Sequence, residues 1–171
     1  MSLTFVTGGA RSGKSSHALR LADAAGRPVA MIATAEARDA EMLERISAHR
    51  AERPAAWRTV EEPLDLGGAL RGLAPEEFAI VDCLSLWVSN LLEASGAATV
   101  EALAAEAAAL AARHPGGCVA VSNEVGMGIV PVNALARAYR DALGRVNAIW
   151  AEAADDAVFA VSGRLLRLER A

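Results

Sequence analysis

The sequence predicts an α/β fold of three layers, in which a mainly parallel sheet is covered by helices on both faces. Short runs rich in Val, Ile and Ala alternate with longer stretches of helical periodicity along the whole chain. Strands that are separated by helices pair in parallel through right-handed crossovers, and a parallel sheet needs cover on both faces. The length of 171 residues suits one compact domain, and because no linker or internal repeat divides the chain we assign residues 1–171 to a single domain.

Five buried strands are predicted in chain order, each from a short run of mostly apolar and β-branched residues. These runs are Leu3–Thr7, Val29–Ala33, Phe78–Asp82, Cys118–Ser122 and Ala157–Ser162. After the last of them, Ser162-Gly163-Arg164 predicts a tight turn into a short strand at Leu165–Leu168. This final strand is expected to be antiparallel to its neighbour.

Helices are predicted where apolar residues recur every three or four positions. The predicted ranges are 14–26, 39–52, 64–71, 85–94, 99–113 and 133–155. In open parallel sheets, ligands bind beyond the carboxyl ends of the strands. We therefore expect a functional site among the residues that follow the strands, at 8–15, 34–38, 82–85 and 123–131.

Composition excludes several classes of protein. With 53% hydrophobic and 22% charged residues the chain is not a disordered tail, and a net charge of −4 offers no basic excess for a nucleic-acid partner. Cys83 and Cys118 lie in apolar runs, which indicates buried thiols. No signal peptide is evident and no apolar run reaches the roughly 18 residues of a membrane span, so we expect a cytoplasmic protein.

A phosphate-binding motif joins the first predicted strand to the first predicted helix. The segment matches G-x-x-x-x-G-K-[ST] and consists of Gly8, Gly9, Ala10, Arg11, Ser12, Gly13, Lys14 and Ser15. Small residues let backbone N–H groups turn around phosphate oxygens, and the helix directs its positive N-terminus at the same point. Lys14 is expected to reach the β- and γ-phosphates and Ser15 to bind Mg²⁺. The alternative is a chance match in a glycine-rich turn.

Asp82 ends the third predicted strand, where a carboxylate is placed to hold Mg²⁺ directly or through water. The alternative is that Asp82 caps the helix that begins near Leu84. The phosphate site by itself does not choose among kinases, ATPases, GTPases and transferases. A guanine-reading NKxD motif of the Ras type is absent, because the nearest candidate reads Ser122-Asn123-Glu124-Val125.

His49 is the candidate nucleophile on the second predicted helix. It shares a helical stripe with Met42 and Ile46, so by itself it suits a half-buried packing residue as well as a catalyst. The arginines beside it, Arg50 and Arg53, suit attack of the imidazole on phosphorus, because they stabilise charge on the phosphoryl oxygens. The alternative is a solvated helix with weak surface ion pairs.

Six segments together resemble the bifunctional adenosylcobinamide kinase / adenosylcobinamide-phosphate guanylyltransferase family of cobalamin biosynthesis. They read GGARSGKS at 8–15, IATAEARDAEM at 32–42, RISAHRAERP at 45–54, WRTVEEP at 57–63, VDCLSLWVSNLL at 81–92 and SNEVGMGIVP at 122–131. The resemblance continues through ARAYRDALGRVN at 136–147 and VSG at 161–163, so it covers nearly the whole chain.

The resemblance implies two reactions. ATP or GTP phosphorylates the aminopropanol hydroxyl of adenosylcobinamide, and GTP then donates GMP to the resulting phosphate through a guanylyl-histidine, which gives adenosylcobinamide-GDP and pyrophosphate. The histidine maps onto His49; some members carry two adjacent histidines there, whereas this chain has Ala48-His49. The resemblance also implies a RecA-like P-loop fold and a homotrimer.

The same resemblance implies a set of nucleotide-binding positions. They are the motif at 8–15 together with Ala33, Thr34, Ala35, Arg50, Ala51, Glu52, Arg53, Glu61 and Asp82. Among these, Glu61 is implied by the resemblance alone. The loop Asn123–Pro131 is expected to take part in a corrinoid or phosphate site, although an ordinary glycine-rich connection fits it nearly as well. Two other functions stay open: a P-loop kinase for another metabolite, and a nucleotide-binding regulatory module without catalysis.

Overall fold

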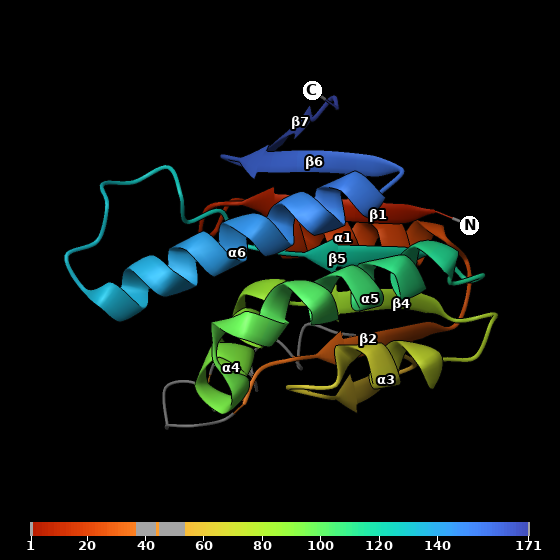
Figure 1. The fold of residues 1–171 in the computed structure, drawn as a ribbon. Coiled ribbons are helices and arrows are strands. Elements are labelled where there is room, and N and C mark those ends of the chain that lie inside the picture. Colours follow the sequence, from red (N-terminus) through yellow and green to blue (C-terminus); the bar gives the residue numbers. More distant parts are fainter. Residues whose placement is uncertain (1, 37–43, 45–53, 171) are drawn as a thin grey trace.

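The computed structural model describes residues 2–36, 44 and 54–170 and consists of one seven-stranded sheet with helices on both faces (Figure 1). The strand order is β3-β2-β4-β5-β1-β6-β7. Every neighbouring pair is parallel except β6 with β7, which is antiparallel. The predicted three-layer α/β fold and its antiparallel end are confirmed.

The strands lie close to the positions that the apolar runs predict. Their bounds are β1 Leu3–Gly8, β2 Val29–Ala33, β3 Arg58–Glu61, β4 Phe78–Asp82, β5 Cys118–Val121, β6 Asp156–Val161 and β7 Arg164–Arg167. The five predicted buried strands match β1, β2, β4, β5 and β6 within one residue at each end. The predicted final strand, Leu165–Leu168, matches β7 with a shift of one residue toward the N-terminus.

One strand, β3, is absent from the sequence prediction. Its residues are Arg58, Thr59, Val60 and Glu61, and only Val60 is partly buried. A strand at the edge of a sheet has one neighbour and one exposed side, so it does not need the apolar run by which buried strands are recognised. The missed strand matters because it brings Glu61 to the carboxyl edge of the sheet.

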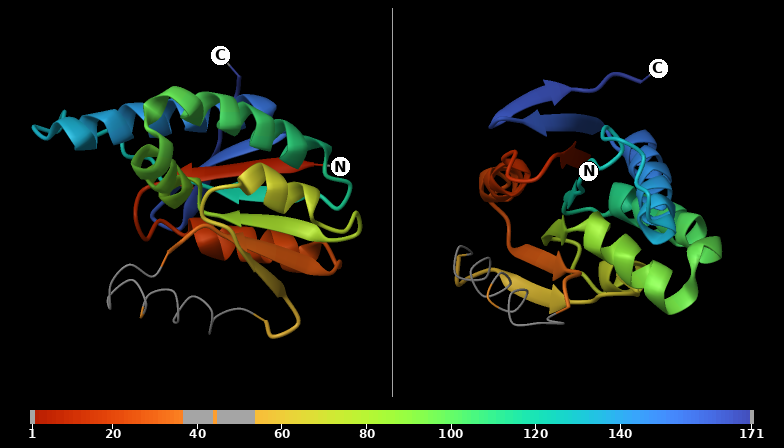
Figure 2. Two further views of the ribbon diagram at one scale, coloured as in Figure 1. Left: turned by 60° about the horizontal axis from the view of Figure 1, so that its bottom comes forward. Right: turned by 90° about the vertical axis from the view of Figure 1, so that its left-hand side faces the viewer.

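Helices cover the two faces unequally (Figure 2). Helix α1 (Lys14–Ala24) packs on one face, and the other face is covered by α3 (Leu66–Arg71), α4 (Leu84–Ser95), α5 (Val100–Arg113) and α6 (Ala134–Ala153). A 3₁₀ turn, Ala97–Thr99, links α4 to α5. The predicted helix at 39–52 lies outside the described residues apart from Glu44, which is helical. The other predicted helices are confirmed with small differences at their ends.

Two apolar cores result from the alternation of side chains along the strands. Val6 packs with Ala18 and Ala22 of α1, whereas Leu3 and Phe5 of the same strand join the larger core under α4, α5 and α6. Abundant alanine on α5 lets this helix lie close to the sheet and to α6. The core therefore packs against both faces of the central strands, and the expected site lies at the strand ends.

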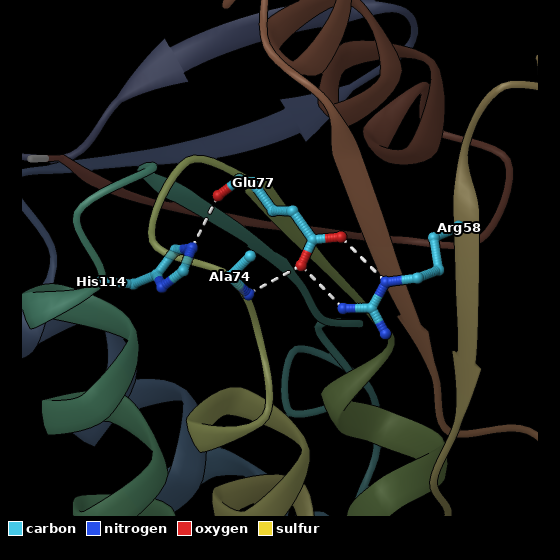
Figure 3. A network of polar contacts seen from close by, with 4 residues as sticks. All are labelled: Arg58, Ala74, Glu77 and His114. Atoms are coloured by element: carbon cyan, nitrogen blue, oxygen red, sulfur yellow. Dashed lines mark hydrogen bonds and ion pairs between the residues drawn. The ribbon is translucent and has the colours of Figure 1, made fainter.

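At the amino edge of the sheet a polar cluster joins three elements (Figure 3). The Arg58 guanidinium donates two hydrogen bonds to the Glu77 carboxylate, at 2.7 and 2.8 Å, and the Ala74 N–H donates a third at 2.8 Å. A ring nitrogen of buried His114 lies 2.6 Å from the Glu77 carbonyl oxygen. These contacts fix the entries into β3, β4 and β5, at the edge opposite the expected site.

In the part of the chain that the structure describes, no helix is both long and apolar enough to cross a membrane.

Candidate active site

The phosphate-binding motif forms a tight turn between β1 and α1. The cap residue of α1 is Gly13, which adopts a left-handed conformation (φ 100°), and no side chain caps the helix. The first backbone N–H groups of a helix have no partner within the helix, so an uncapped N-terminus offers them to an anion. The predicted cradle thus has the backbone arrangement that a phosphate needs.

Neighbouring strands brace this turn from two sides. The Glu124 N–H donates to the Gly8 carbonyl at 3.0 Å, and the Gly163 N–H donates to the Ser12 carbonyl at 3.0 Å. A Cβ at Gly8 would lie 2.2 Å from the Ala160 carbonyl oxygen, so only glycine fits beside β6. The loop after β5 and the β6–β7 turn therefore hold the cradle in shape.

Lys14 closes over the turn from the first turn of α1. Its amino group lies 2.5 Å from the Gly9 carbonyl oxygen and 3.4 Å from the Ser12 hydroxyl. Burial lowers the pKa of Lys14, and Cys83 and Asp82 partly oppose this effect. A buried lysine that is held by a carbonyl and a hydroxyl gains a strong partner when a phosphate enters.

Asp82 is the last residue of β4 and stands near Lys14. The residue at the cap position of α4 is Cys83, one position after Asp82, and its side chain makes no capping bond. Strand β5 lies between β1 and β4, and the cradle and Asp82 therefore flank the end of β5. This places a carboxylate at the mouth of the phosphate site.

The oxygen groups at the mouth of the cradle fit Mg²⁺. Ser15 lies in the first turn of α1, and Asp82 of β4 and Val6 of β1 pair with the same residue of β5, Val121, from opposite sides. Magnesium bound with nucleotides takes one or two protein oxygens and completes its shell with phosphates and water. The described residues contain no cluster of three or more His, Cys, Asp and Glu side chains that could hold a metal ion.

Register brings three of the predicted binding positions side by side. Ala33 pairs with Glu61 of β3 on one side and with Asp82 of β4 on the other. Thr34 follows Ala33 and is fully buried. Sequence reasoning alone does not select Glu61, since β3 carries no apolar signal; the strand-end rule finds it once β3 is recognised.

The loop after β5 exposes apolar side chains. Met127, Ile129 and Val132 are 78%, 98% and 97% exposed. The loop projects from the sheet between β5 and α6 (Figure 1), and the Arg137 guanidinium holds its end by donating to the carbonyls of Pro131 (3.0 Å) and Val132 (2.6 Å). Exposed apolar side chains of this kind occur on surfaces that contact a ligand or another protein.

The candidate nucleophile and its neighbours lie outside the described residues. These positions are His49, Arg50, Ala51, Glu52 and Arg53. The structure brings together the other predicted residues at the carboxyl edge: the cradle at 8–15, Ala33, Thr34, Ala35, Glu61 and Asp82.

Solved structures share the architecture but little sequence. The flagellar accessory protein FlaH from Methanocaldococcus jannaschii has a TM-score of 0.50 at 15% identity, and the match covers 96% of this chain and 74% of that one. A solved ATPase domain has a TM-score of 0.50 at 12% identity, with 92% and 68% covered. The fold is that of the RecA-like P-loop NTPases, as predicted.

Sequence relatives are much closer. The bifunctional adenosylcobalamin biosynthesis protein CobU of Salmonella typhimurium is 45% identical over 175 residues, which cover 94% of this chain and 96% of the relative. The protein CobP of Pseudomonas aeruginosa, with the same description, is 44% identical over 159 residues, and the match covers 92% of each chain. The family model for cobinamide kinase / cobinamide phosphate guanyltransferase matches residues 4–168. The cradle and Asp82 thus stand within a chain that belongs, along nearly its whole length, to this cobinamide kinase and guanyltransferase family.

Proposed function

We propose that this chain is one P-loop catalytic domain, residues 1–171, that converts adenosylcobinamide to adenosylcobinamide-GDP in two steps at one nucleotide site. The observation that carries the proposal is that the phosphate cradle follows β1 and Asp82 ends β4, the two strands that flank β5, in a chain that matches the family over residues 4–168. The substrates are ATP or GTP in the first step and GTP in the second.

In the first step the aminopropanol hydroxyl attacks the γ-phosphorus. The bond from that phosphorus to the β–γ bridging oxygen breaks, the hydroxyl proton is released, and a nucleoside diphosphate leaves. The backbone N–H groups of the cradle and Lys14 stabilise the charge on the phosphate oxygens. Ser15 and Asp82 would hold Mg²⁺, which neutralises the β- and γ-phosphates when it is bound.

In the second step a ring nitrogen of His49 attacks the α-phosphorus of GTP and pyrophosphate leaves. A phosphate oxygen of adenosylcobinamide phosphate then attacks the same phosphorus, and the P–N bond breaks to restore the free imidazole. Arg50 and Arg53, beside His49 in sequence, are placed to stabilise the charge on the oxygens of that phosphorus. Of the remaining positions, Ala33, Ala35, Ala51, Glu52 and Glu61 contact the nucleotide in this proposal, whereas the Thr34 hydroxyl is engaged by Cys83.

Labelling with α-³²P GTP tests this function. The wild-type chain is expected to gain a label that acid removes and base does not, as for a phosphorus–nitrogen bond, and His49→Ala is expected to gain none. His49→Ala should still phosphorylate added cobinamide, since the kinase step does not use the imidazole. A label retained in His49→Ala would refute the assignment of the nucleophile.

The two rival functions predict other outcomes of the same experiment. A kinase for another metabolite would show neither the label nor phosphorylation of cobinamide but would hydrolyse or transfer from ATP. A regulatory module would bind nucleotide and transfer nothing. The described residues offer no feature that favours either rival over the two-step enzyme.

Three further features belong to the proposal. The exposed apolar side chains around Met127 and Ile129 support a role for residues 123–131 in the corrinoid site. We propose that the protein is a homotrimer. Sedimentation equilibrium would test this, and a monomer at micromolar concentration would refute it.

We place the enzyme in the cytoplasm, where both free thiols, Cys83 and Cys118, stay reduced.

A further inference from the structure

We propose that Thr34 and Asn123 are positioning residues that hold the end of β4 from both sides and so fix the Asp82 carboxylate toward the metal. The inference rests on the proposed function in one respect, which is that Asp82 is the carboxylate for Mg²⁺. It assigns to the Thr34 hydroxyl a role other than contact with the nucleotide.

We call the contacts that Thr34 and Asn123 make around the end of β4 the clamp. Thr34 supplies its first side. Its hydroxyl donates to the Cys83 carbonyl at 2.7 Å and accepts from the Cys83 N–H at 3.0 Å. The Thr34 N–H donates to the Asp82 carbonyl at 3.1 Å. Both main-chain groups of the residue after Asp82 are therefore satisfied by one hydroxyl, and the backbone on the carboxyl side of Asp82 is bound to Thr34.

Thr34 is itself held in place. It is fully buried, and the Asn90 side chain of α4 donates to its carbonyl at 2.8 Å and to the Pro63 carbonyl at 3.1 Å. The hydroxyl has one proton to donate, and that proton is engaged by Cys83. A fully buried hydroxyl in this arrangement orients Asp82 instead of donating to a phosphate.

Asn123 supplies the second side. Its amide donates to the Ser85 hydroxyl at 3.1 Å, and that hydroxyl lies 2.9 Å from the Cys83 thiol. Asn147 of α6 donates to the Asn123 carbonyl at 3.0 Å, which fixes the residue at the end of β5. Because β5 lies between β1 and β4, Asn123 couples the side of the cradle to the segment after Asp82.

The clamp predicts an effect on metal affinity that a purely structural role of the Thr34 hydroxyl would not produce. Partners that orient a metal-binding carboxylate change metal affinity by about 10–100-fold when they are removed. A hydroxyl that only stabilised the fold would change the unfolding midpoint and leave metal affinity unaltered. A hydroxyl that bound phosphate would change nucleotide affinity even when no metal is present.

The test titrates Mn²⁺, as a probe for Mg²⁺, into the complex of the full chain with GDP and follows free Mn²⁺ by electron paramagnetic resonance. For Thr34→Val we expect the Kd of Mn²⁺ to rise at least about tenfold, and GDP affinity without metal to stay within about twofold of wild type. Thr34→Ser keeps the hydroxyl and is expected to bind Mn²⁺ as wild type does. Thr59→Val, an exposed position on β3, is the matched control.

Asn123→Ala covers the case in which Thr34→Val does not fold, because Asn123 is only half-buried. We expect it to raise the Kd of Mn²⁺ in the same direction by about threefold to tenfold. Unchanged Mn²⁺ affinity in both variants would overturn the clamp, and so would a loss of metal-free GDP binding in Thr34→Val that matched the loss of Mn²⁺ binding.

Asp82→Asn separates this inference from the proposed function. If Asp82→Asn weakens Mn²⁺ binding while Thr34→Val and Asn123→Ala do not, the metal role of Asp82 stands and the clamp alone fails. If Asp82→Asn binds Mn²⁺ as wild type does, the metal role itself is wrong and the clamp fails with it.

Discussion

Two polar clusters lie at opposite edges of the same sheet, and comparing them shows what buried polar groups can do. At the amino edge, Glu77 is bound by Arg58 and its carbonyl by His114 (Figure 3). At the carboxyl edge, Thr34 binds the main chain of Cys83. Both clusters join segments far apart in the sequence through hydrogen bonds of similar length.

Their surroundings differ. The carboxyl-edge cluster stands beside an uncapped helix N-terminus, a buried lysine and an acidic strand end, all of which suit an anion and its metal. The amino-edge cluster is satisfied within itself by a carboxylate and a guanidinium. Buried polar groups thus stabilise the fold at both edges of the sheet. Only at the carboxyl edge do they lie beside groups that a phosphate would satisfy, and this marks the functional edge.

The largest expected effect is at the carboxyl edge. In the proposed function Lys14 stabilises the charge on the transferred phosphoryl group, so we expect Lys14→Ala to lower cobinamide phosphorylation at least about 100-fold. Thermal unfolding should shift little, because the amino group is held by one carbonyl and one hydroxyl within its own loop. Arg20→Ala, on the exposed side of α1, is the control. Equal losses in both variants would contradict the role of Lys14.

The next largest effect is expected from a substitution at the amino edge of the sheet. In Gly116→Ala the new Cβ would lie 1.7 Å from the Glu77 carbonyl oxygen and 3.0 Å from a ring nitrogen of His114. We expect the free energy of unfolding in urea to fall by about 3 kcal/mol, with kcat per folded molecule unchanged. Gly144→Ala, where nothing lies within 4 Å of the new Cβ, should instead gain up to about 1 kcal/mol. A fall in the kcat of Gly116→Ala without a fall in its free energy of unfolding would contradict a purely structural role for the amino edge.

A smaller effect is expected from Glu77→Gln. The change removes the charge of a pair whose arginine is 48% exposed, so solvent screens much of the interaction. We expect a loss of about 1 kcal/mol in the free energy of unfolding at pH 7, again with unchanged kcat. A loss beyond about 3 kcal/mol would mean that the Arg58 pair is far less screened than its exposure indicates.

The pH dependence of that loss is the smallest effect. The hydrogen bond from Arg58 lowers the pKa of Glu77 from its ordinary 4.5, against the opposing effect of burial. A carboxyl whose pKa is lower in the folded state stabilises the protein above its unfolded value, and this contribution is lost as the pH falls through the folded value. The difference between wild type and Glu77→Gln should therefore be constant above about pH 5.5 and shrink below about pH 4.5. A difference that grew at low pH would contradict the assigned direction.

The comparison also shows how far sequence reasoning reaches. Buried strands are predicted closely because both faces of each must be apolar, and the cradle is predicted because its glycines follow the first strand. Edge strand β3 is missed because only Val60 in it is partly buried. The family resemblance supplies Glu61, which the fold then places beside Ala33.

The roles of Thr34 and Asn123 within the site become visible only in the three-dimensional structure. The hydroxyl of Thr34 meets Cys83 across 49 positions of sequence, and the Asn123 amide meets Ser85 across 38. No periodicity or motif encodes such pairs, because each depends on which strands become neighbours in the sheet. From the sequence, Thr34 is therefore indistinguishable from a residue that touches the nucleotide directly.

The strand order also sets when this protein acquires its cradle during synthesis on the ribosome. Strand β1 is made before its two neighbours, β5 and β6, and Ser12 accepts its brace from Gly163. A chain that stops before residue 163 has the phosphate motif in sequence and lacks the contact from Gly163, although Glu124 can still bind Gly8. The contact between Gly163 and Ser12 can therefore form only after nearly the whole of this sequence has been made.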